Sequence, residues 1–257
     1  KYKINQVSIY DKNDYVGGRV KTINEKNDIF EAGAARFTKH NKNLYKLIKR
    51  FNLQDKLINI PSGWNVKTNK SYNIKKELQD IDKLLEKLIN LSKKKSKKYL
   101  QNITLADFCK EELGREYLDF LHDNHPYYSE INVLNCYQAV KIFSDDLSEK
   151  QTFHILYGGL SQITDNLAKS FKKKGGKIHL NYMLEKIEYD NSTNLFTIYF
   201  DNLGNKVQEK CERLICAMDS NALKKIDFLK NNIKELNSVK TQPLLRLYQK
   251  FPTKNKK

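Results

Sequence analysis

The chain has 257 residues, a formal net charge of +17 and a hydrophobic content of 39%. This apolar content is enough to form a core, so the composition excludes a globally disordered chain. No apolar run approaches the roughly 20 residues that a membrane-spanning helix needs.

The positive charge has two explanations. Clustered Lys and Arg side chains attract phosphates, so a nucleic-acid partner is one of them. The other is an A/T-rich genome, whose coding favours the Lys, Asn and Ile residues that are abundant here. The charge is spread along the chain, apart from one dense lysine run at 93–98. We therefore rank nucleic acid as the weaker prediction.

The four cysteines show no C-x-x-C spacing. This pattern predicts reduced core thiols in a cytoplasmic protein rather than a disulfide framework. The cysteines are Cys109, Cys136, Cys211 and Cys216.

The first predicted element is a buried parallel strand, Gln6–Tyr10, which is followed at once by the carboxylate of Asp11. Seven residues after the strand the chain reads Gly17–Arg19, a Gly-Gly-Arg turn. An acid at the carboxyl end of a parallel strand can accept hydrogen bonds from a ribose diol. Glycines let the backbone approach a bulky anion, and the planar fork of arginine can pair with a diphosphate. The pattern therefore indicates a nucleotide-binding loop.

A mostly helical region follows, from residue 39 to about residue 150. Apolar residues at helical spacing predict helices over 44–51 and 78–88, and an apolar stretch predicts another over 131–143. Thr104 followed by Asp107 predicts a helix N-cap with an acid in the first turn.

Strand signals return at Thr152–Tyr157, and a helix with apolar residues on one face begins at Leu160. Gly175 and Gly176 are expected to end this helix. A hairpin turn is predicted over 201–205. The strands predicted after the helix are Lys177–Leu180, Met183–Tyr189, Leu195–Phe200, Val207–Cys211 and Arg213–Cys216.

Two motifs near the start resemble the FAD-binding signature of the flavin-dependent amine oxidase family. In that family the second strand ends in an acid, usually Glu, and a Gly-Gly-Arg turn follows. Asp11 stands at the position of the acid, and Gly17–Arg19 matches the turn letter for letter. The stretch Phe30–Phe37, which reads FEAGAARF, resembles the segment that passes beside the flavin ring.

The second half of the chain extends the resemblance. Ile178–Ile187 is similar to the family's I-x-L-N-x-x-V-x-x-I strand, and Leu184 stands where a Val backbone usually contacts the adenine. Leu214–Met218 resembles the last strand of the FAD domain, with Met218 in place of the usual Pro.

The final predicted strand, Leu244–Phe251, is similar to a strand of the substrate domain. Many members carry there a lysine that holds a water against flavin N5, and Arg246 occupies this position. Arginine is always charged and differs in shape from lysine. Either the oxidase chemistry is altered, or Arg246 contacts something else.

The chain contains no G-x-G-x-x-G fingerprint before Asp11, and the family's C-terminal FAD-binding segment is also missing. We interpret the chain as a fragment, or as a degenerate copy that lost its first βα unit. His122 and His125 form an H-x-x-H pair without a third ligand in sight, so no metal site is predicted.

The resemblance implies an α/β fold with a discontinuous, Rossmann-like FAD-binding domain and an inserted substrate domain, mostly helical with some β structure. The FAD domain would comprise 1–38 and 151–220, and the substrate domain would comprise 39–150 and 221–257. The implied catalytic residue is Arg246. The implied cofactor-binding residues are Asp11, Gly17, Gly18, Arg19, Gly33, Ala34, Ala35, Arg36 and Leu184.

The function implied by the resemblance is oxidation of a small amine by hydride transfer to FAD, with oxygen as the electron acceptor. Two alternatives remain open. One keeps the fold but takes a different substrate, as in carotenoid desaturases and protoporphyrinogen oxidases. The other is a degenerate, non-catalytic basic protein that binds nucleic acid or another partner.

Overall fold

The computed structural model describes residues 6–26, 28–60, 70–147, 152–239, 241 and 245–249. It divides into two compact units. Unit 1 comprises Lys1–Ile58 and Ile155–Lys257, and unit 2 comprises Asn59–His154. The division does not identify ligand-binding domains, so the predicted domain boundaries stay a prediction.

Unit 1 contains a short parallel pair, β1 (Ser8–Tyr10) and β6 (Lys177–His179), in which Ile9 lies opposite Ile178. The prediction of a parallel strand is confirmed, but the prediction that it is buried is wrong. Ile9 is 44% exposed, because β6 is the only strand paired with β1 among the described residues. The mixed helix and sheet content is confirmed, whereas the Rossmann-like and inserted-domain details stay predictions.

A hairpin that the sequence did not predict follows the Gly-Gly-Arg turn. Its strands are β2 (Thr22–Glu25) and β3 (Asp28–Glu31), which pair antiparallel with Thr22 opposite Glu31. The hairpin carries the chain directly from the Gly-Gly-Arg turn to the second motif of the resemblance.

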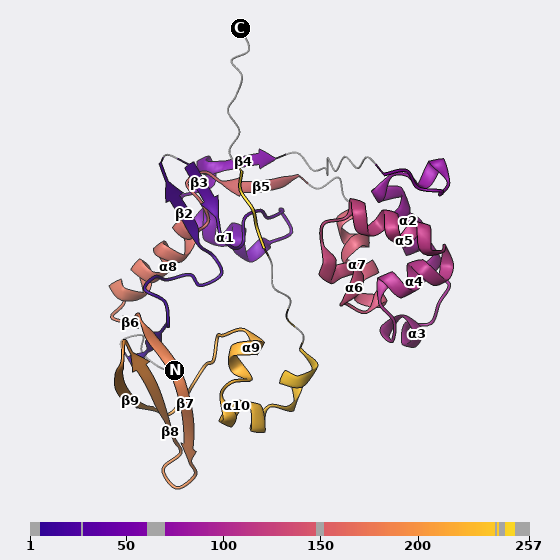
Figure 1. Ribbon diagram of the computed structural model, residues 1–257. Helices are drawn as coiled ribbons and strands as arrows, with labels where there is room; N and C mark the ends of the chain where they lie inside the picture. Colours follow the sequence, from indigo (N-terminus) through magenta and orange to yellow (C-terminus); the bar gives the residue numbers. More distant parts are fainter. Residues whose placement is uncertain are drawn as a thin grey trace. The chain divides into compact units, whose positions relative to one another are not determined.

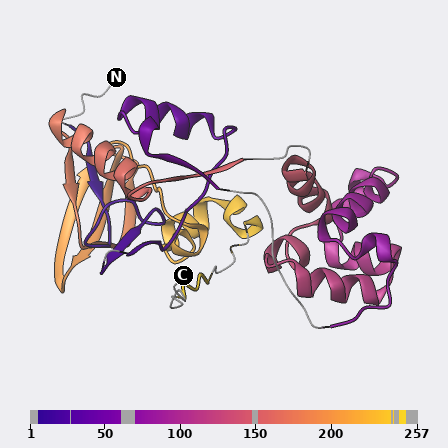
Figure 2. The same ribbon diagram turned by 90° about the horizontal axis from the view of Figure 1, so that it is seen from above.

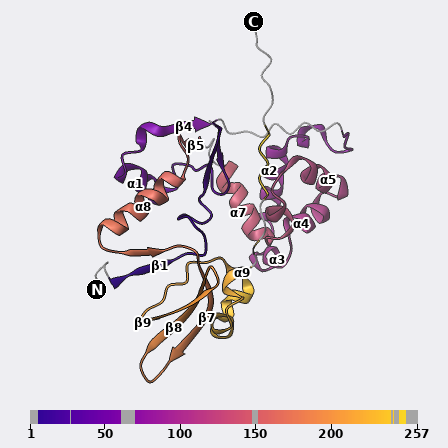
Figure 3. The ribbon, with the colours of Figure 1, turned by 60° about the vertical axis from the view of Figure 1, so that its left-hand side comes forward.

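Two amphipathic helices of unit 1 share one apolar cluster. α1 (Lys42–Arg50) buries Ile48, and α8 (Ser161–Lys173) buries Ile163, in the same cluster as Phe37. Figure 3 shows α1 and α8 lying side by side. The helical spacing predicted for this part of the chain is therefore confirmed.

Short elements connect this region to the rest of the chain. A single 3-10 turn, η2 (Gln54–Lys56), leads into β4 (Leu57–Ile60), which pairs with β5 (Phe153–Leu156). The strand predicted over 152–157 is thus confirmed.

The remaining sheet of unit 1 is an antiparallel three-stranded meander, whose strands lie next to one another in Figure 1. The strands are β7 (Tyr182–Asp190), β8 (Leu195–Asn202) and β9 (Asn205–Cys211). The predicted hairpin between β8 and β9 is present, and both residues of its turn, Leu203 and Gly204, have positive φ.

A small apolar cluster joins this meander to the elements that follow it. Ile187 of β7 is buried together with Ile226 and Leu229. The elements after the meander are α9 (Ser220–Leu223), α10 (Asp227–Asn232) and η4 (Lys234–Ser238).

The strand predicted at Arg213–Cys216 is wrong, because residues 213–217 pair with no strand. The side chains of Leu214 and Cys216 pack against the cluster under the meander, whereas Ile215 is 89% exposed. The apolar alternation therefore reflects packing on one side without a ladder of hydrogen bonds.

The described part of unit 2 is mostly helical, and Figure 2 shows its helices packed on one another. Its largest fully buried side chains include Phe108, Leu88 and Leu121. The helical elements are η3 (Lys76–Leu78), α2 (Ile81–Ser92), α3 (Lys97–Gln101), α4 (Leu105–Glu112), α5 (Arg115–Asn124), α6 (Tyr128–Asn132) and α7 (Cys136–Leu147).

Local capping explains where several of these helices begin. Thr104 accepts from the backbone N–H of Asp107, whose side chain accepts from the backbone N–H of Thr104. This reciprocal capping box satisfies N–H groups that the helix itself leaves unpaired, and it confirms the predicted N-cap. The single helix predicted over 131–143 is wrong, since α6 and α7 are separated at 133–135. There the backbone N–H of Cys136 donates to the carbonyl oxygen of Ile103.

The cysteines differ in accessibility, which gives a testable expectation. Cys109 and Cys136 are fully buried, and burial raises the pKa of each thiol to about 12. Cys211 and Cys216 are half-buried, and burial raises their pKa as well.

Because thiolates react and thiols do not, we expect iodoacetamide at pH 8 to modify Cys211 and Cys216 first. Cys109 and Cys136 should react only after unfolding in urea. Mass spectrometry of tryptic peptides over a time course measures this order. Equal rates for Cys109 and Cys211 in the native chain would contradict it.

None of the helices in the described part of the chain combines the length and apolar character required to cross a bilayer.

Candidate functional site

The carboxyl end of β1 is held by backbone and ring contacts. The backbone N–H of Asp11 donates to the carbonyl oxygen of His179 at 2.9 Å. The ring of Tyr10 stacks on His179, with 4.6 Å between centroids, and on Phe200, with 4.5 Å. Asp11 thus follows a strand end that is fixed from two sides.

The carboxylate of Asp11 is half-buried. Its Oδ1 accepts from the backbone N–H and from the Nδ2 of Asn13, each at 2.9 Å. No described residue donates a hydrogen bond to the other oxygen, Oδ2. One carboxylate oxygen of Asp11 is therefore available to a ligand at the place where the sequence predicts a ribose.

The Gly-Gly-Arg turn has a conformation that requires glycine. Gly17 has φ +108° and Gly18 has φ +54°, and the backbone N–H of Val20 donates to the carbonyl oxygen of Gly17 at 2.9 Å. A Cβ on Gly17 would lie 2.6 Å from the carbonyl oxygen of Val20. A Cβ on Gly18 would meet nothing within 4 Å, so open space faces this glycine.

The two motifs meet at the backbone. The N–H of Ala34 donates to the carbonyl oxygen of Arg19 at 3.0 Å, and the N–H of Ala32 donates to that of Lys21 at 2.8 Å. A Cβ on Gly33 would lie only 1.8 Å from the carbonyl oxygen of Arg19. The structure thus brings together seven of the predicted residues, which lie in 17–19 and 33–36.

The side chains of these residues differ in exposure. Those of Arg19, Ala34 and Arg36 are exposed, whereas Ala35 is half-buried. Arg19 lies near enough to Asp219 to act on it electrostatically. The backbone N–H of Ala222 lowers the pKa of Asp219 the most, and the positive charge of Arg19 lowers it further. The Arg19 guanidinium therefore faces solvent beside an acid.

Glu31 is a residue whose role the sequence did not predict. Its Oε1 accepts from the backbone N–H of Leu160 at 2.6 Å, at the start of α8. Its Oε2 accepts from the hydroxyl of Thr22 at 3.0 Å. A carboxylate there pairs with an N–H that the helix leaves unsatisfied and interacts favourably with the helix dipole.

A second pair of contacts supports the same junction. The backbone N–H of Thr22 donates to the hydroxyl of Ser161 at 2.7 Å, and the backbone N–H of Ser161 donates to the hydroxyl of Thr22 at 3.0 Å. The first turn of α8 is thereby bound to the hairpin. No local pattern could have revealed this, since Glu31 and Leu160 are 129 residues apart.

Arg246 lies beside the same hairpin. Its Nη1 donates to the carbonyl oxygen of Glu31 at 3.2 Å, and the Tyr248 hydroxyl donates to that oxygen at 2.8 Å. The ring of Tyr248 also packs edge-on against Phe30, with 4.9 Å between centroids. Arg246 is therefore close to the predicted flavin-lining stretch.

The predicted strand over 244–251 is wrong for residues 245–249, which have no strand hydrogen bonding, and its other residues lie outside the described part. Leu245 and Leu247 are 81% and 83% exposed. Side-chain contacts of Arg246 and Tyr248 to Glu31, rather than a backbone ladder, hold this segment.

Leu184 lies in β7, whose first residue, Tyr182, donates its backbone N–H to the carbonyl oxygen of Asp11 at 2.8 Å. Leu184 pairs with Phe200, but the next pair is Lys186 with Tyr199, so Glu185 is left out of the ladder. Such a β-bulge leaves backbone groups unpaired by the neighbouring strand. The backbone beside Leu184 is therefore available to another partner.

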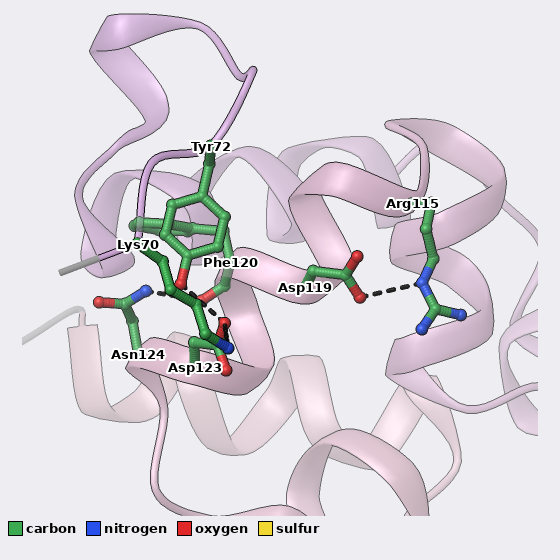
Figure 4. Close-up of polar contacts among 7 residues, drawn as sticks. All are labelled: Lys70, Tyr72, Arg115, Asp119, Phe120, Asp123 and Asn124. Carbon is green, nitrogen blue, oxygen red and sulfur yellow. Dashed lines mark hydrogen bonds and ion pairs between the residues drawn. The ribbon is translucent and has the colours of Figure 1, made fainter. Parts of the chain in front are cut away.

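Unit 2 has a polar hollow of its own, with a volume of about 350 Å³. Figure 4 shows Lys70 and Tyr72 pointing toward Asp123, with distances of 2.8 and 2.7 Å to its Oδ2. These two hydrogen bonds, led by that of Lys70, lower the pKa of Asp123. Nearby, Nε of Arg115 forms an ion pair with Oδ1 of Asp119 at 2.9 Å. The charged groups here pair largely with one another.

An open hollow of about 760 Å³ lies in unit 1 against β7, β8 and α10. None of the predicted site residues lines either hollow. The hollow in unit 1 is lined by Ile187, Glu188, Tyr189, Asp190, Thr197, Phe228, Asn231 and Asn232.

The two histidines of the H-x-x-H pair have different partners. Nε2 of His122 lies 3.0 Å from Oδ1 of Asn132. His125 is buried against Tyr127 and Phe143, and this burial lowers its pKa. Within the described residues, no group of three potential ligands is placed to hold a metal ion.

The comparisons with known proteins agree with the resemblance. The fold resembles wild-type putrescine oxidase bound to putrescine, with a TM-score of 0.62 and 17% identity over 85% of this chain and 54% of that one. It also resembles a protoporphyrinogen oxidase-like protein from Exiguobacterium sp. 255-15, with a TM-score of 0.56 and 16% identity. That match covers 90% of this chain and 57% of the other.

The chain thus spans about half the length of the solved structures that it matches. The model of the family described as flavin containing amine oxidoreductase matches residues 5–256, almost the entire chain. FAD is therefore the cofactor that the family implies, and the chain belongs to the flavin-containing amine oxidoreductases.

Proposed function

We propose that this chain functions as an FAD-dependent oxidoreductase that oxidises a small amine by hydride transfer to flavin, with oxygen as the electron acceptor. The observation that carries the proposal is the backbone junction of Arg19 with Gly33 and Ala34. It joins the loop assigned to the diphosphate to the stretch assigned to the flavin. Family membership supports both assignments.

The residues present fit the adenosine and diphosphate parts of FAD. The free Oδ2 of Asp11 can accept from a ribose hydroxyl. The open space at Gly18 allows a phosphate to approach the backbone, and Arg19 can pair with it through two parallel N–H groups. The backbone beside Leu184, released by the bulge, can contact the adenine.

FAD, when bound, supplies the hydride acceptor for the C–H bond next to the amine nitrogen. The chain's own residues bind and orient it. Gly33, Ala34 and Ala35 carry little or no side chain, so they let a flat ring lie close to the backbone. In this proposal Arg246 is the catalytic residue that stands in place of the family's lysine, next to the carbonyl oxygen of Glu31.

The direct test is the visible absorption spectrum of the purified chain after gel filtration, with and without added FAD. Retained flavin absorption supports the proposal. Where flavin is retained, hydrogen peroxide release with small amines tests the reaction itself. Flavin retention without amine turnover would reject the amine as substrate but keep the cofactor.

Arg19→Ala is expected to weaken FAD binding about 10-fold to 100-fold, because a charge-assisted hydrogen bond contributes about 1.5–3 kcal/mol. Fluorescence titration of FAD measures the Kd. Arg115→Ala is the matched control, since it removes an exposed arginine of unit 2 that pairs with Asp119. A Kd for Arg19→Ala within twofold of the control would reject the diphosphate role.

A second substrate class is supported by the resemblance to the protoporphyrinogen oxidase-like protein. A flavoenzyme of that kind would act on a polyene or tetrapyrrole rather than on an amine. Anaerobic mixing of the flavin-loaded chain with each substrate class, followed by product analysis, separates the two proposals. Only one of the two classes should reduce the bound flavin.

A further inference from the structure

We propose that the exposed faces of α1 and α8 form a binding surface for duplex nucleic acid, contacted through its phosphates. This basic face consists of eight exposed cations. They are Lys42, Lys46, Lys49, Arg50, Lys169, Lys172, Lys173 and Lys174. The proposal concerns a surface separate from the flavin-binding residues and does not depend on the proposed function.

The spacing of these residues places them on the outer sides of the helices. In α1, Lys42, Lys46, Lys49 and Arg50 follow the helical period. The opposite side of α1, which includes Ile48, is buried in the cluster that α1 shares with α8. The basic residues are therefore turned away from the apolar cluster.

The two helices present their cations together. Nη2 of Arg50 lies 3.2 Å from the hydroxyl of Ser170, so the end of α1 reaches the last turns of α8. Figures 1 and 3 show the helices as neighbours from two directions. The cations at the end of α1 thus lie beside the turns of α8 that carry Lys169 and Lys172.

The charge of the face is not balanced locally. Asp165 is the only acid within α1 and α8. No ion pair links any of the eight cations to the residues that the structure describes. By contrast, Lys206 in the meander pairs with both Glu185 and Asp201.

Helix ends explain only part of this arrangement. Cations are favourable in the last turn of a helix, which accounts for Lys49, Arg50, Lys172 and Lys173. It does not account for Lys42 and the other cations outside the last turns. Unpaired like charges repel one another, and a polyanion would relieve that repulsion.

The chemistry of the face favours phosphates over a lipid surface. Of the large apolar side chains in α1 and α8, only Leu167 counts among the exposed ones, at 38%. A helix that binds a bilayer inserts an apolar face, and the apolar side of α1 is already buried in the core. Phe51 and Phe171 are half-buried, so the face has no exposed ring on which single-stranded bases could stack. A duplex bound by its backbone fits these properties best.

The test is fluorescence anisotropy with a labelled 20-base-pair DNA duplex and the full purified chain. If the face neutralises about four phosphates, log Kd should change with log salt by a slope of about 3.6. Affinity should then fall about 100-fold between 50 and 200 mM salt. Absence of binding at 50 mM salt, or a slope near zero, would overturn the proposal.

A pair of variants with equal net charge locates the surface. The face variant carries Lys46→Gln, Lys49→Gln, Lys169→Gln and Lys172→Gln, and we expect it to bind the duplex at least tenfold more weakly. The control variant replaces four exposed lysines of unit 2 with Gln. They are Lys83, Lys87, Lys93 and Lys94.

The control variant should stay within twofold of the unmodified chain. Equal losses in both variants would mean that net charge alone drives binding, and would overturn the proposal. A face variant that loses binding to phosphatidylserine vesicles but keeps duplex binding would overturn it as well. Circular dichroism of both variants verifies that neither has lost its helices.

Discussion

Gly33→Ala is expected to destabilise unit 1 by about 3 kcal/mol. The added Cβ would lie 1.8 Å from the carbonyl oxygen of Arg19, and that atom belongs to the backbone. A flexible side chain could move away, but here the loop itself has to shift. The shift would also strain the hydrogen bond from Ala34 to Arg19. Urea unfolding followed by circular dichroism measures the loss.

Gly18→Ala is the matched control for this prediction. Gly18 lies in the same turn with φ +54°, but a Cβ there meets nothing within 4 Å. Its cost should therefore be only the left-handed conformation, about 1–2 kcal/mol. If both substitutions have the same cost, Gly33 does not lie in close contact with the backbone of Arg19.

Phe108→Ala is expected to destabilise unit 2 by about 3–5 kcal/mol, because it removes a fully buried ring and leaves a cavity. Phe108 lies in the first turns of α4, within the large apolar cluster of this unit. The helical signal of unit 2 should be lost at a lower urea concentration. Circular dichroism at about 222 nm, which reports the helical content, follows this transition.

Lys110→Ala tests whether the loss arises from the cavity. Lys110 is exposed on the same helix, so its replacement should change stability by no more than about 0.5 kcal/mol. An unchanged urea midpoint for Phe108→Ala would show that the ring is not packed in the core.

The parts of the fold that sequence predicts well are those with a local cause. The helix that begins after Thr104 is an example, since the capping residues and the apolar spacing lie within a few positions of one another. The hairpin turn at Leu203 and Gly204 is another. Both depend on neighbours in the chain, which a sequence displays directly.

The failed predictions concern features that depend on distant partners. Arg213–Cys216 has the apolar content of a strand but no strand to pair with. Ile9 belongs to a strand whose exposure depends on which other strands cover it. The local sequence pattern indicates neither whether a segment has a strand to pair with nor how far other elements cover it.

The same distinction applies to the candidate site. The residue types of Gly17–Arg19 indicated a tight loop, and the structure has glycines of positive φ there. The role of Glu31 could not be predicted, because its partners are the start of α8 and the side chains of Arg246 and Tyr248. The roles proposed for these residues toward FAD stay predictions.

The division of the chain into a continuous and a discontinuous unit has a consequence for biosynthesis. Unit 2 is one uninterrupted segment, whereas unit 1 is assembled from segments on either side of it. Domains tend to fold as the chain emerges from the ribosome. Unit 2 can thus complete its core before β6 is synthesised. Until then β1 lacks this partner, since β6 lies more than 160 residues later in the chain. Until α8 has been made, the hairpin that follows the Gly-Gly-Arg loop lacks the contact of Glu31 with Leu160.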